Sequence, residues 1–151
     1  MKSKFFSMLA IAAIFSIASC HDDDKHVSVR NFKSTHCKSV SNVLTMSFGE
    51  MQNELAEKVI YTAQGSYLHI LHENALHNCY EENTVDVSVK VEGDSIFIKT
   101  VDTQPLANCV CEYDLEYEVG PLSYGNYVIS IDNDLEFPIT FSASTNGVYP
   151  E

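Results

Sequence analysis

Alternation of apolar and acidic residues between Cys109 and Ile131 constrains the fold of this chain more than any other feature. From position 109 to 117 the odd residues are Cys, Cys, Tyr, Leu and Tyr, and from 112 to 118 the even residues are Glu, Asp, Glu and Glu. Successive side chains of a strand point to opposite faces, so this segment predicts a half-buried strand with one apolar face and one face of carboxylates. A corner at Gly120–Tyr127 leads into a second alternating strand.

Shorter alternating runs fill most of the remaining chain. Residues 85–99 predict a hairpin that turns at Gly93 and has one solvated face, and residues 135–141 predict a last strand. Pro138 cannot donate to a strand ladder, which places that last strand at an edge or a bulge. Residues 40–48 predict a first strand with a weaker pattern.

Residues 48–63 allow either a helix or a strand. A capping-box sequence precedes apolar residues at helical spacing, whereas residues 59–62 are β-branched or aromatic and Gly65 stands where a hairpin would turn. We therefore expect a short helical or irregular piece near residues 50–55. A hairpin follows, and its expected arms are residues 57–63 and 67–73.

Short strands with frequent turns and no strongly periodic helix predict an all-β sandwich. We expect this domain to occupy residues 37–146. The preceding residues 20–36 show no sustained period and are expected to be a tether, and residues 147–151 are expected to be a tail.

The corner between the two long strands contains a leucine, a turn glycine and a tyrosine, at Leu122, Gly125 and Tyr127. This arrangement resembles the tyrosine corner of immunoglobulin and fibronectin type III domains, in which the phenol hydrogen-bonds to upstream backbone. The resemblance implies an immunoglobulin/fibronectin III-like β-sandwich of about seven antiparallel strands, which we expect to be stapled by disulfides.

The N-terminus has the features of an export signal. Two lysines precede an apolar run over residues 5–17, which has the length of a signal-peptide core and is too short to span a bilayer comfortably. The run ends in Ile-Ala-Ser before Cys20, which resembles the lipobox of bacterial lipoproteins. The resemblance implies that residues 1–19 are a lipoprotein signal peptide and that acyl chains on Cys20 anchor the mature chain to a membrane. An ordinary secreted protein with Cys20 left for a disulfide is the alternative.

An acidic segment follows the cysteine, with Asp22, Asp23 and Asp24 in a row. It resembles the export signal of Bacteroidetes surface lipoproteins, which implies an outer-membrane protein that is exposed at the cell surface. A solvated tether is the alternative, because neighbouring carboxylates repel one another and cannot be buried together.

The net charge limits the partners. The chain has a formal net charge of -12 at pH 7, and removal of residues 1–19 takes away two lysines and no acidic residue, which leaves about -14. This charge argues against nucleic acid and anionic lipid headgroups as partners. We attribute it to solubility, and a cationic partner is also compatible with it.

Four cysteines remain if Cys20 is lipidated, and this even number predicts two disulfides in an oxidising compartment. Cys109 and Cys111 share one strand face and are too close in the chain to bridge each other without strain, so each should pair with Cys37 or Cys79. We favour a bridge from Cys79 to Cys109 or Cys111, which closes a loop of about 30 residues, over a bridge from Cys37 to Cys79.

A group of histidines could instead bind a metal together with Cys79. His69, His72 and His77 lie near this cysteine and near Glu73, and they are the visible candidates for a metal-dependent hydrolase. Their spacing matches no standard zinc finger and lacks the i, i+4 histidine pair of a zincin helix. We therefore predict no metal and no cofactor, and we place these histidines on a solvated strand face.

The carboxylates of the central strand would lie about 7 Å apart along one face. We expect this regular row to be solvated surface rather than a calcium or cationic-ligand site; its members are Glu112, Asp114, Glu116 and Glu118. The sequence also lacks a Gly-x-Ser-x-Gly motif and a phosphate-binding glycine loop, so we predict no enzyme.

Residues 57–145 resemble a group of uncharacterised Bacteroidetes lipoproteins. The resemblance rests on the patterns Leu-x-Ile-x-His, Asn-Cys, Cys-x-Cys-x-Tyr-Asp-Leu-x-Tyr and Leu-x-x-Gly-x-Tyr, and it implies location and fold but no active-site residues. We expect a surface-anchored, non-enzymatic module that binds or presents a glycan or protein ligand through end loops and exposed tyrosines such as Tyr67 or Tyr124. A structural subunit of an envelope complex is the alternative, and it would expose a large apolar patch.

Overall fold

The computed structural model describes residues 26–38, 40–41, 56–80, 85–104 and 107–150. These residues form strands and connections without a helix, and none of them belongs to a helix that could cross a membrane. The expected signal peptide, Cys20, the aspartates after it and the expected piece at 50–55 lie outside the described residues. The strands are β1 (Ser28–Ser34), β2 (Val40–Ser41), β3 (Lys58–Gln64), β4 (Tyr67–Asn78), β5 (Val85–Glu92), β6 (Ser95–Asp102), β7 (Val110–Gly120), β8 (Gly125–Ile131), β9 (Leu135–Phe141) and β10 (Asn146–Tyr149).

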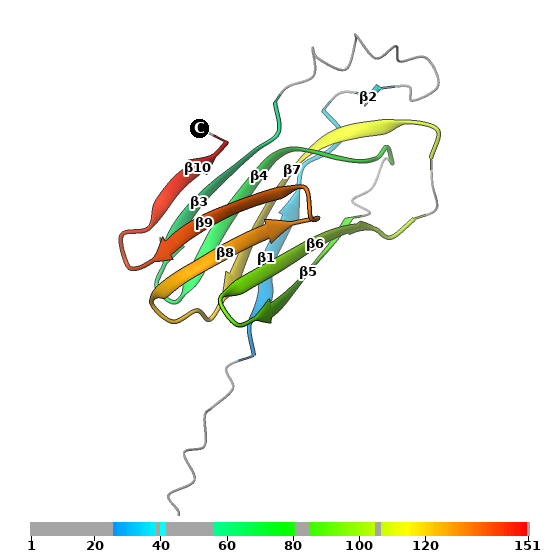
Figure 1. Cartoon of the computed structure of the whole chain (residues 1–151). Coiled ribbons are helices and arrows are strands. Elements are labelled where there is room, and N and C mark those ends of the chain that lie inside the picture. The colour runs from blue at the N-terminus through cyan, green and yellow to red at the C-terminus, as the bar shows by residue number, and fades with distance from the viewer. Residues whose placement is uncertain (1–25, 39, 42–55, 81–84, 105–106, 151) are drawn as a thin grey trace, which may run out of the picture.

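Two sheets pack face to face in a β-sandwich-like arrangement (Figure 1). The larger sheet has the strand order β1-β7-β4-β3-β10, with β2 also paired to β7, and the smaller sheet has the order β5-β6-β8-β9. The prediction of an all-β fold is therefore confirmed. The described residues form ten strands, counting the two-residue β2, where about seven were expected.

One pair of strands departs from the expected antiparallel pattern. β6 and β8 run parallel, with Ser95 opposite Val128 and Ile98 opposite Ile131. Between these two strands the chain crosses to the larger sheet and forms β7. Parallel neighbours need such a crossover connection, and here a strand of the opposite sheet provides it.

Alternation places the apolar side chains between the sheets. In β7 the odd-numbered residues from Cys111 to Val119 are all at most 1 % exposed, as the pattern predicts. They join Ile96, Ile129 and Phe141 of the smaller sheet in one core cluster. Each large apolar side chain that is fully buried in this way contributes about 1.5–3 kcal/mol to folding.

The N-terminal segment belongs to the larger sheet. β1 pairs antiparallel with β7, with Ser28 opposite Gly120, so the tether prediction is wrong for residues 28–34. Asn31 has a positive φ of 55° and lies where the register shifts. This bulge moves the inward-facing positions from Val29 to Phe32, which is an odd-to-even change that hides the strand period in the sequence.

The C-terminal segment also belongs to this sheet. β10 pairs with β3, so the tail prediction is wrong for residues 147–149. Tyr149 stacks on Phe137 of β9 with ring centroids 4.7 Å apart, and Phe137 stacks on Tyr61 of β3 at 5.3 Å. This stack of three rings joins the two sheets at one edge and holds a strand that is too short to show a period.

The hairpin predictions are confirmed. β3 and β4 turn at Gly65, which has a φ of 64°, and β5 and β6 turn at Gly93, which has a φ of 60°. Residues 58–63 are therefore strand rather than helix. β4 continues beyond its expected end through a bulge at Asn74, whose φ is 62°. Pro138 lies in β9, which is an edge strand as predicted.

The corner between β7 and β8 fixes the start of β8. Tyr127 Oη donates a hydrogen bond to the carbonyl oxygen of Ser123 at 3.0 Å. The backbone N–H of Leu122, whose side chain is buried, donates to the carbonyl oxygen of Ser66 at 2.7 Å. Gly125 is the first residue of β8. The corner is thereby attached to the turn between β3 and β4.

Candidate functional site

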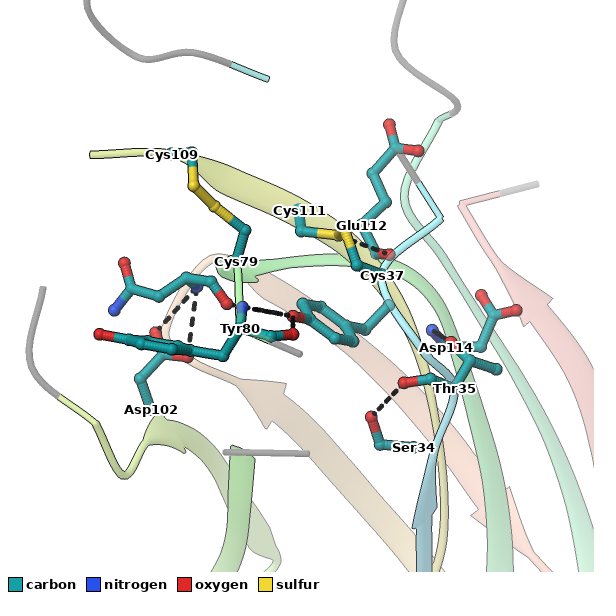
Figure 2. The surroundings of a disulfide bond; sticks show 12 residues. Ser34, Thr35, Cys37, Cys79, Tyr80, Asp102, Cys109, Cys111, Glu112 and Asp114 are labelled. Atoms are coloured by element: carbon teal, nitrogen blue, oxygen red, sulfur yellow. Dashed lines mark hydrogen bonds between the residues drawn. A yellow bond between two sulfur atoms is a disulfide. The ribbon is translucent and has the colours of Figure 1, made fainter. Parts of the chain in front are cut away.

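Two disulfides hold one end of the sandwich (Figure 2). Cys37 is bonded to Cys111 and joins residues 74 positions apart, while Cys79 is bonded to Cys109 and joins residues 30 positions apart. The prediction that the two close cysteines have separate partners, with Cys79 bound to one of them, is confirmed. The first bond ties the N-terminal segment to β7, and the second ties the region after β4 to the region before β7.

The carboxylates on the outer face of β7, here called the acidic row, are Glu112, Asp114, Glu116 and Glu118. The expectation of a solvated face is wrong for Glu112 and Glu118, which are buried, whereas Asp114 and Glu116 are partly exposed. The N-terminal segment supplies cations to the row. The ion pairs are Arg30–Glu118 at 2.6 Å, Lys33–Glu116 at 3.2 Å and Lys38–Asp114 at 2.5 Å.

Both carboxylate oxygens of Glu118 accept hydrogen bonds, which fix this arrangement. Asn31 donates to its Oε1 at 3.0 Å and Arg30 donates to its Oε2 at 2.6 Å. These hydrogen bonds, that of Asn31 first, lower the pKa of Glu118. The Arg30 guanidinium also lies 3.2 Å above the ring centre of Tyr67, so this tyrosine is covered, whereas Tyr124 is 68 % exposed.

A polar pocket of about 390 Å³ lies between the two sheets, where β4, β6 and the β8–β9 turn meet. We call it the end pocket. Four carboxylates and two histidines line it, whereas no lysine or arginine does so among the described residues. Its volume lies within the range of small-ligand sites, roughly 300–1,000 Å³. The lining residues are Glu57, His72, Ala75, Leu76, His77, Thr100, Asp102, Ile131, Asp132, Asp134 and Leu135.

His72 is the most buried polar residue of the end pocket and is only 1 % exposed. Its Nε2 lies 2.7 Å from Oε1 of Glu57. Because a carboxylate accepts hydrogen bonds, we assign the proton to Nε2, and in this tautomer Nδ1 carries a lone pair. Nδ1 is buried and has no hydrogen-bond partner among the described residues. Within the described part of the chain, His72 therefore has a buried nitrogen without a partner in the wall of the end pocket.

His77 lies beside Asp102, with 3.5 Å between Nδ1 and Oδ1. Burial lowers the pKa of His77, and the nearby Asp102 opposes this effect only in part, so the ring is neutral at neutral pH. Both oxygens of Asp102 accept from the backbone N–H of Asn78, at 3.2 and 3.3 Å (Figure 2). Tyr113 Oη donates to the carbonyl oxygen of Asn78 at 3.1 Å, which fixes this end of β4.

Asp132 and Asn133 are the first two residues of the three-residue turn, residues 132–134, between β8 and β9. Both have positive φ, of 53° and 64°, as a type I′ hairpin turn requires and as Asp and Asn tolerate. Asp132 Oδ1 accepts from the backbone N–H of Thr100 at 2.8 Å, and Oδ2 accepts from the Thr100 hydroxyl at 2.5 Å. The turn is thereby tied to β6, and its carboxylate has a fixed position in the end pocket.

A second unpaired polar atom lies in the core. The phenol oxygen of Tyr117 is buried and has no hydrogen-bond partner within the described part of the chain. Burial, and next the charge of Asp132, raises the pKa of Tyr117, so the phenol stays neutral. Tyr117 therefore adds a polar group to the core without adding a charge.

The structure does not bring the candidate hydrolase residues together. His69 faces the acidic row and Glu73 pairs with Lys58 at 2.7 Å, both on the outer face of the larger sheet. His72 and His77 are buried between the sheets, so the expectation of a solvated histidine face is wrong for these two. In the described part of the chain, no three His, Cys, Asp or Glu side chains are arranged to hold a metal ion.

The sequence does not reveal that the carboxylates of the end pocket lie together. Asp102 ends a strand, Asp132 lies in a turn and Glu57 precedes a strand, so nothing local connects them. Only the pairing of the strands brings them to one place. The apolar alternation that leads into His72 was the one usable signal, because it assigns this histidine to the inner face.

Comparison with known proteins adds no relative: no family model, curated protein or solved structure matches this chain. All-β folds of this general kind carry many unrelated functions. A function for this chain is therefore argued from the end pocket itself.

Proposed function

We propose that this chain is a surface-anchored, non-enzymatic binding module and that its glycan or protein ligand occupies the end pocket. One observation carries this proposal: a cavity of about 390 Å³ combines several carboxylates with a buried His72 whose Nδ1 has no partner among the described residues. Binding sites present a few oriented polar groups in a concave pocket on rigid elements. Asp102 and Asp132 meet this requirement because backbone N–H groups of neighbouring strands hold them.

The proposed location rests on the sequence. The lipobox-like segment that ends at Cys20 and the acidic run Asp22–Asp24 support lipid anchoring in the outer membrane with exposure at the cell surface. β1 begins at Ser28, so a tether after Cys20 would be shorter than first expected. The folded domain would then lie close to the membrane surface.

The alternative, a subunit of an envelope complex, needs a contiguous apolar surface. The large apolar side chains that are exposed among the described residues are distributed over β4, β6, β10 and the β7–β8 corner. Only two of them share a strand face, and Lys99 lies between those two. The exposed residues are Leu76, Phe97, Val101, Tyr124 and Val148. This distribution favours a ligand-binding module over a subunit.

An immunoglobulin or fibronectin III-like relationship is also part of this proposal. The hydrogen bond from Tyr127 to the carbonyl of Ser123 supports it, because a tyrosine corner makes a bond of this direction. The parallel pair β6–β8 and the additional strands depart from the expected pattern. The relationship is thus a proposal about architecture and carries no ligand.

The proposed function can be tested by capture. The full chain in a non-ionic detergent is immobilised and probed with envelope extracts and a glycan array. Leu135→Trp adds bulk to a half-buried residue of the end pocket, and Val148→Trp makes the corresponding change on exposed β10. Capture by the wild type and by Val148→Trp, with loss in a folded Leu135→Trp variant, is the expected result. Equal capture by all three, or no capture at all, would reject a ligand in the end pocket.

A further inference from the structure

We propose that the end pocket binds an alkylammonium group, of which a lysine side chain is the common example. This inference rests on the proposed function and specifies the chemistry of its ligand. The ammonium would lie among the carboxylates, while its alkyl stem would lie against the apolar part of the wall. The carboxylates are Glu57, Asp102, Asp132 and Asp134, and the apolar residues are Ala75, Ile131 and Leu135.

The charge of the end pocket favours a cation. Four carboxylates line it, and neither lysine nor arginine occurs among its described lining residues. His77 does not neutralise them, because burial lowers its pKa and keeps the ring uncharged. Carboxylates that line the same cavity repel one another, and a bound cation reduces this cost. An anionic ligand would add to the repulsion.

His72 provides a second and independent indication. It lines the end pocket, is 1 % exposed and directs Nε2 to Glu57, while its buried Nδ1 has no partner among the described residues. The lone pair of a neutral imidazole needs a hydrogen-bond donor. An ammonium group has three N–H donors and no acceptor, so it matches both this nitrogen and the carboxylates.

The apolar wall distinguishes an alkylammonium ion from a bare cation. Ile131 and Leu135 line the same cavity as Asp132 and Asp134. A lysine stem packs against apolar surface while its head group reaches polar partners, which is how lysine side chains lie on protein surfaces. A metal ion would leave the apolar wall unused, and among the described residues no three His, Cys, Asp or Glu side chains are arranged to hold one.

The first test compares two ligands that differ in one charge. Isothermal titration of the full chain in non-ionic detergent uses Nα-acetyl-lysine methylamide and the same compound acetylated on Nε. We expect the ammonium form to bind at least about tenfold more tightly, because it alone makes charge-assisted hydrogen bonds. Equal binding of the two compounds would overturn the inference.

Variants assign this binding to the end pocket. Asp134→Asn removes one charge at an exposed lining residue, and Asp94→Asn removes one charge in the turn before β6, at the opposite end of that strand from Asp102. We expect the first change to weaken binding of the lysine compound severalfold and the second to leave it unchanged. Equal effects of both variants would show that overall charge, and not the pocket, attracts the ligand.

Failure of this inference differs from failure of the proposed function. If capture from the array or the extracts depends on Leu135 but the lysine compound does not bind, the ammonium assignment is wrong and the binding module stands. If neither is observed, both are wrong. Calcium that binds where the lysine compound does not would also overturn the ammonium assignment.

A further titration with cadaverine, a free diamine that has the same kind of alkyl stem, distinguishes the possible sources of the ammonium group. Both cadaverine and a lysine residue fit the ammonium chemistry. Tighter binding of cadaverine than of the lysine compound assigns the pocket to free polyamines. Weaker binding of cadaverine assigns it to a lysine residue of a peptide or protein.

Discussion

The acidic row and the end pocket each contain four carboxylates, but of these two sites only the row pairs with lysine and arginine side chains among the described residues. In the acidic row, Arg30, Lys33 and Lys38 of the N-terminal segment form ion pairs with β7. In the end pocket, the described lining residues include two histidines and no lysine or arginine. Three of the four carboxylates of the row are thus paired with cations of the chain. For the pocket, we propose that a ligand supplies the cation.

The disulfides reinforce this difference. Cys37 precedes Lys38, so its bond to Cys111 holds the cation-bearing segment against the acidic row. Cys79 follows Asn78, the residue that holds Asp102, so its bond to Cys109 fixes one wall of the end pocket. One bond thus keeps cations over carboxylates, while the other keeps carboxylates in place.

The largest effect is expected from the bond that covers the acidic row. Replacing Cys37 and Cys111 by serine should lower the free energy of unfolding by about 4 kcal/mol, because a long loop of the unfolded chain is released. Urea unfolding of the full chain in detergent measures this change. The matched control replaces Cys79 and Cys109 by serine. Their disulfide closes a shorter loop, so its removal should cost about 1 kcal/mol less. A larger cost for the control would reverse the assigned roles.

A smaller effect is expected from single members of the acidic row. Glu118→Gln should lower the free energy of unfolding by about 1–2 kcal/mol, because its side chain is only 11 % exposed and accepts charge-assisted hydrogen bonds from Arg30. Glu116→Gln should cost at most about 0.5 kcal/mol, because Lys33 is largely exposed and Glu116 is partly exposed. Thermal unfolding at low and high salt measures both changes. Equal costs would show that burial does not distinguish the members of the row.

The smallest effect is expected from pH. The pKa of His77 is lowered in the folded chain, so the unfolded chain binds more protons just below the ordinary value of 6.5. The contribution of His77 to stability is therefore present above pH 6.5 and is lost as pH falls through the lowered pKa. Glu118, whose pKa is also lowered, acts at more acid pH, where its contribution is lost as the pH falls below about 4.5.

Chemical denaturation between pH 5 and 7 separates the two residues. The wild type should become less stable as the pH falls from about 6.5, and His77→Gln should show a shallower dependence over this range. Glu118→Gln should keep the wild-type slope there. Wild-type stability that rises as the pH falls through this range would contradict the neutral state of His77.

Alternation in the sequence predicted the strands that lack bulges. The β5–β6 hairpin and β7 keep one period throughout, and both were located correctly. β1 and β4 each contain a bulge at an asparagine with positive φ, Asn31 and Asn74, which changes the inward-facing positions from one parity to the other. A pattern search with a constant period misses such a strand or ends it early. A single asparagine between two short alternating runs is the signal that would have found both.

The bulge in β4 explains why the candidate site could not be predicted. His72 is even-numbered and His77 is odd-numbered, so a constant period places them on opposite faces, whereas the bulge at Asn74 turns both inward. The cations of the acidic row were missed for a related reason. Arg30 lies about 90 positions before Glu118, and only long-range pairing of β1 with β7 brings them together.

The pairing of β1 with β7 has a consequence for synthesis. β1 is the first described strand, yet its partner strand is β7. Ser28 of β1 lies opposite Gly120, which comes 92 positions later in the chain. Chains emerge from the ribosome N-terminus first, and contacts between distant positions form slowly. The order in which the strands are made therefore differs from the order in which they can assemble: β1 must remain without its neighbour until most of the domain has been synthesised. A chain shortened before β7 would leave the hydrogen-bonding groups of this strand open to other molecules.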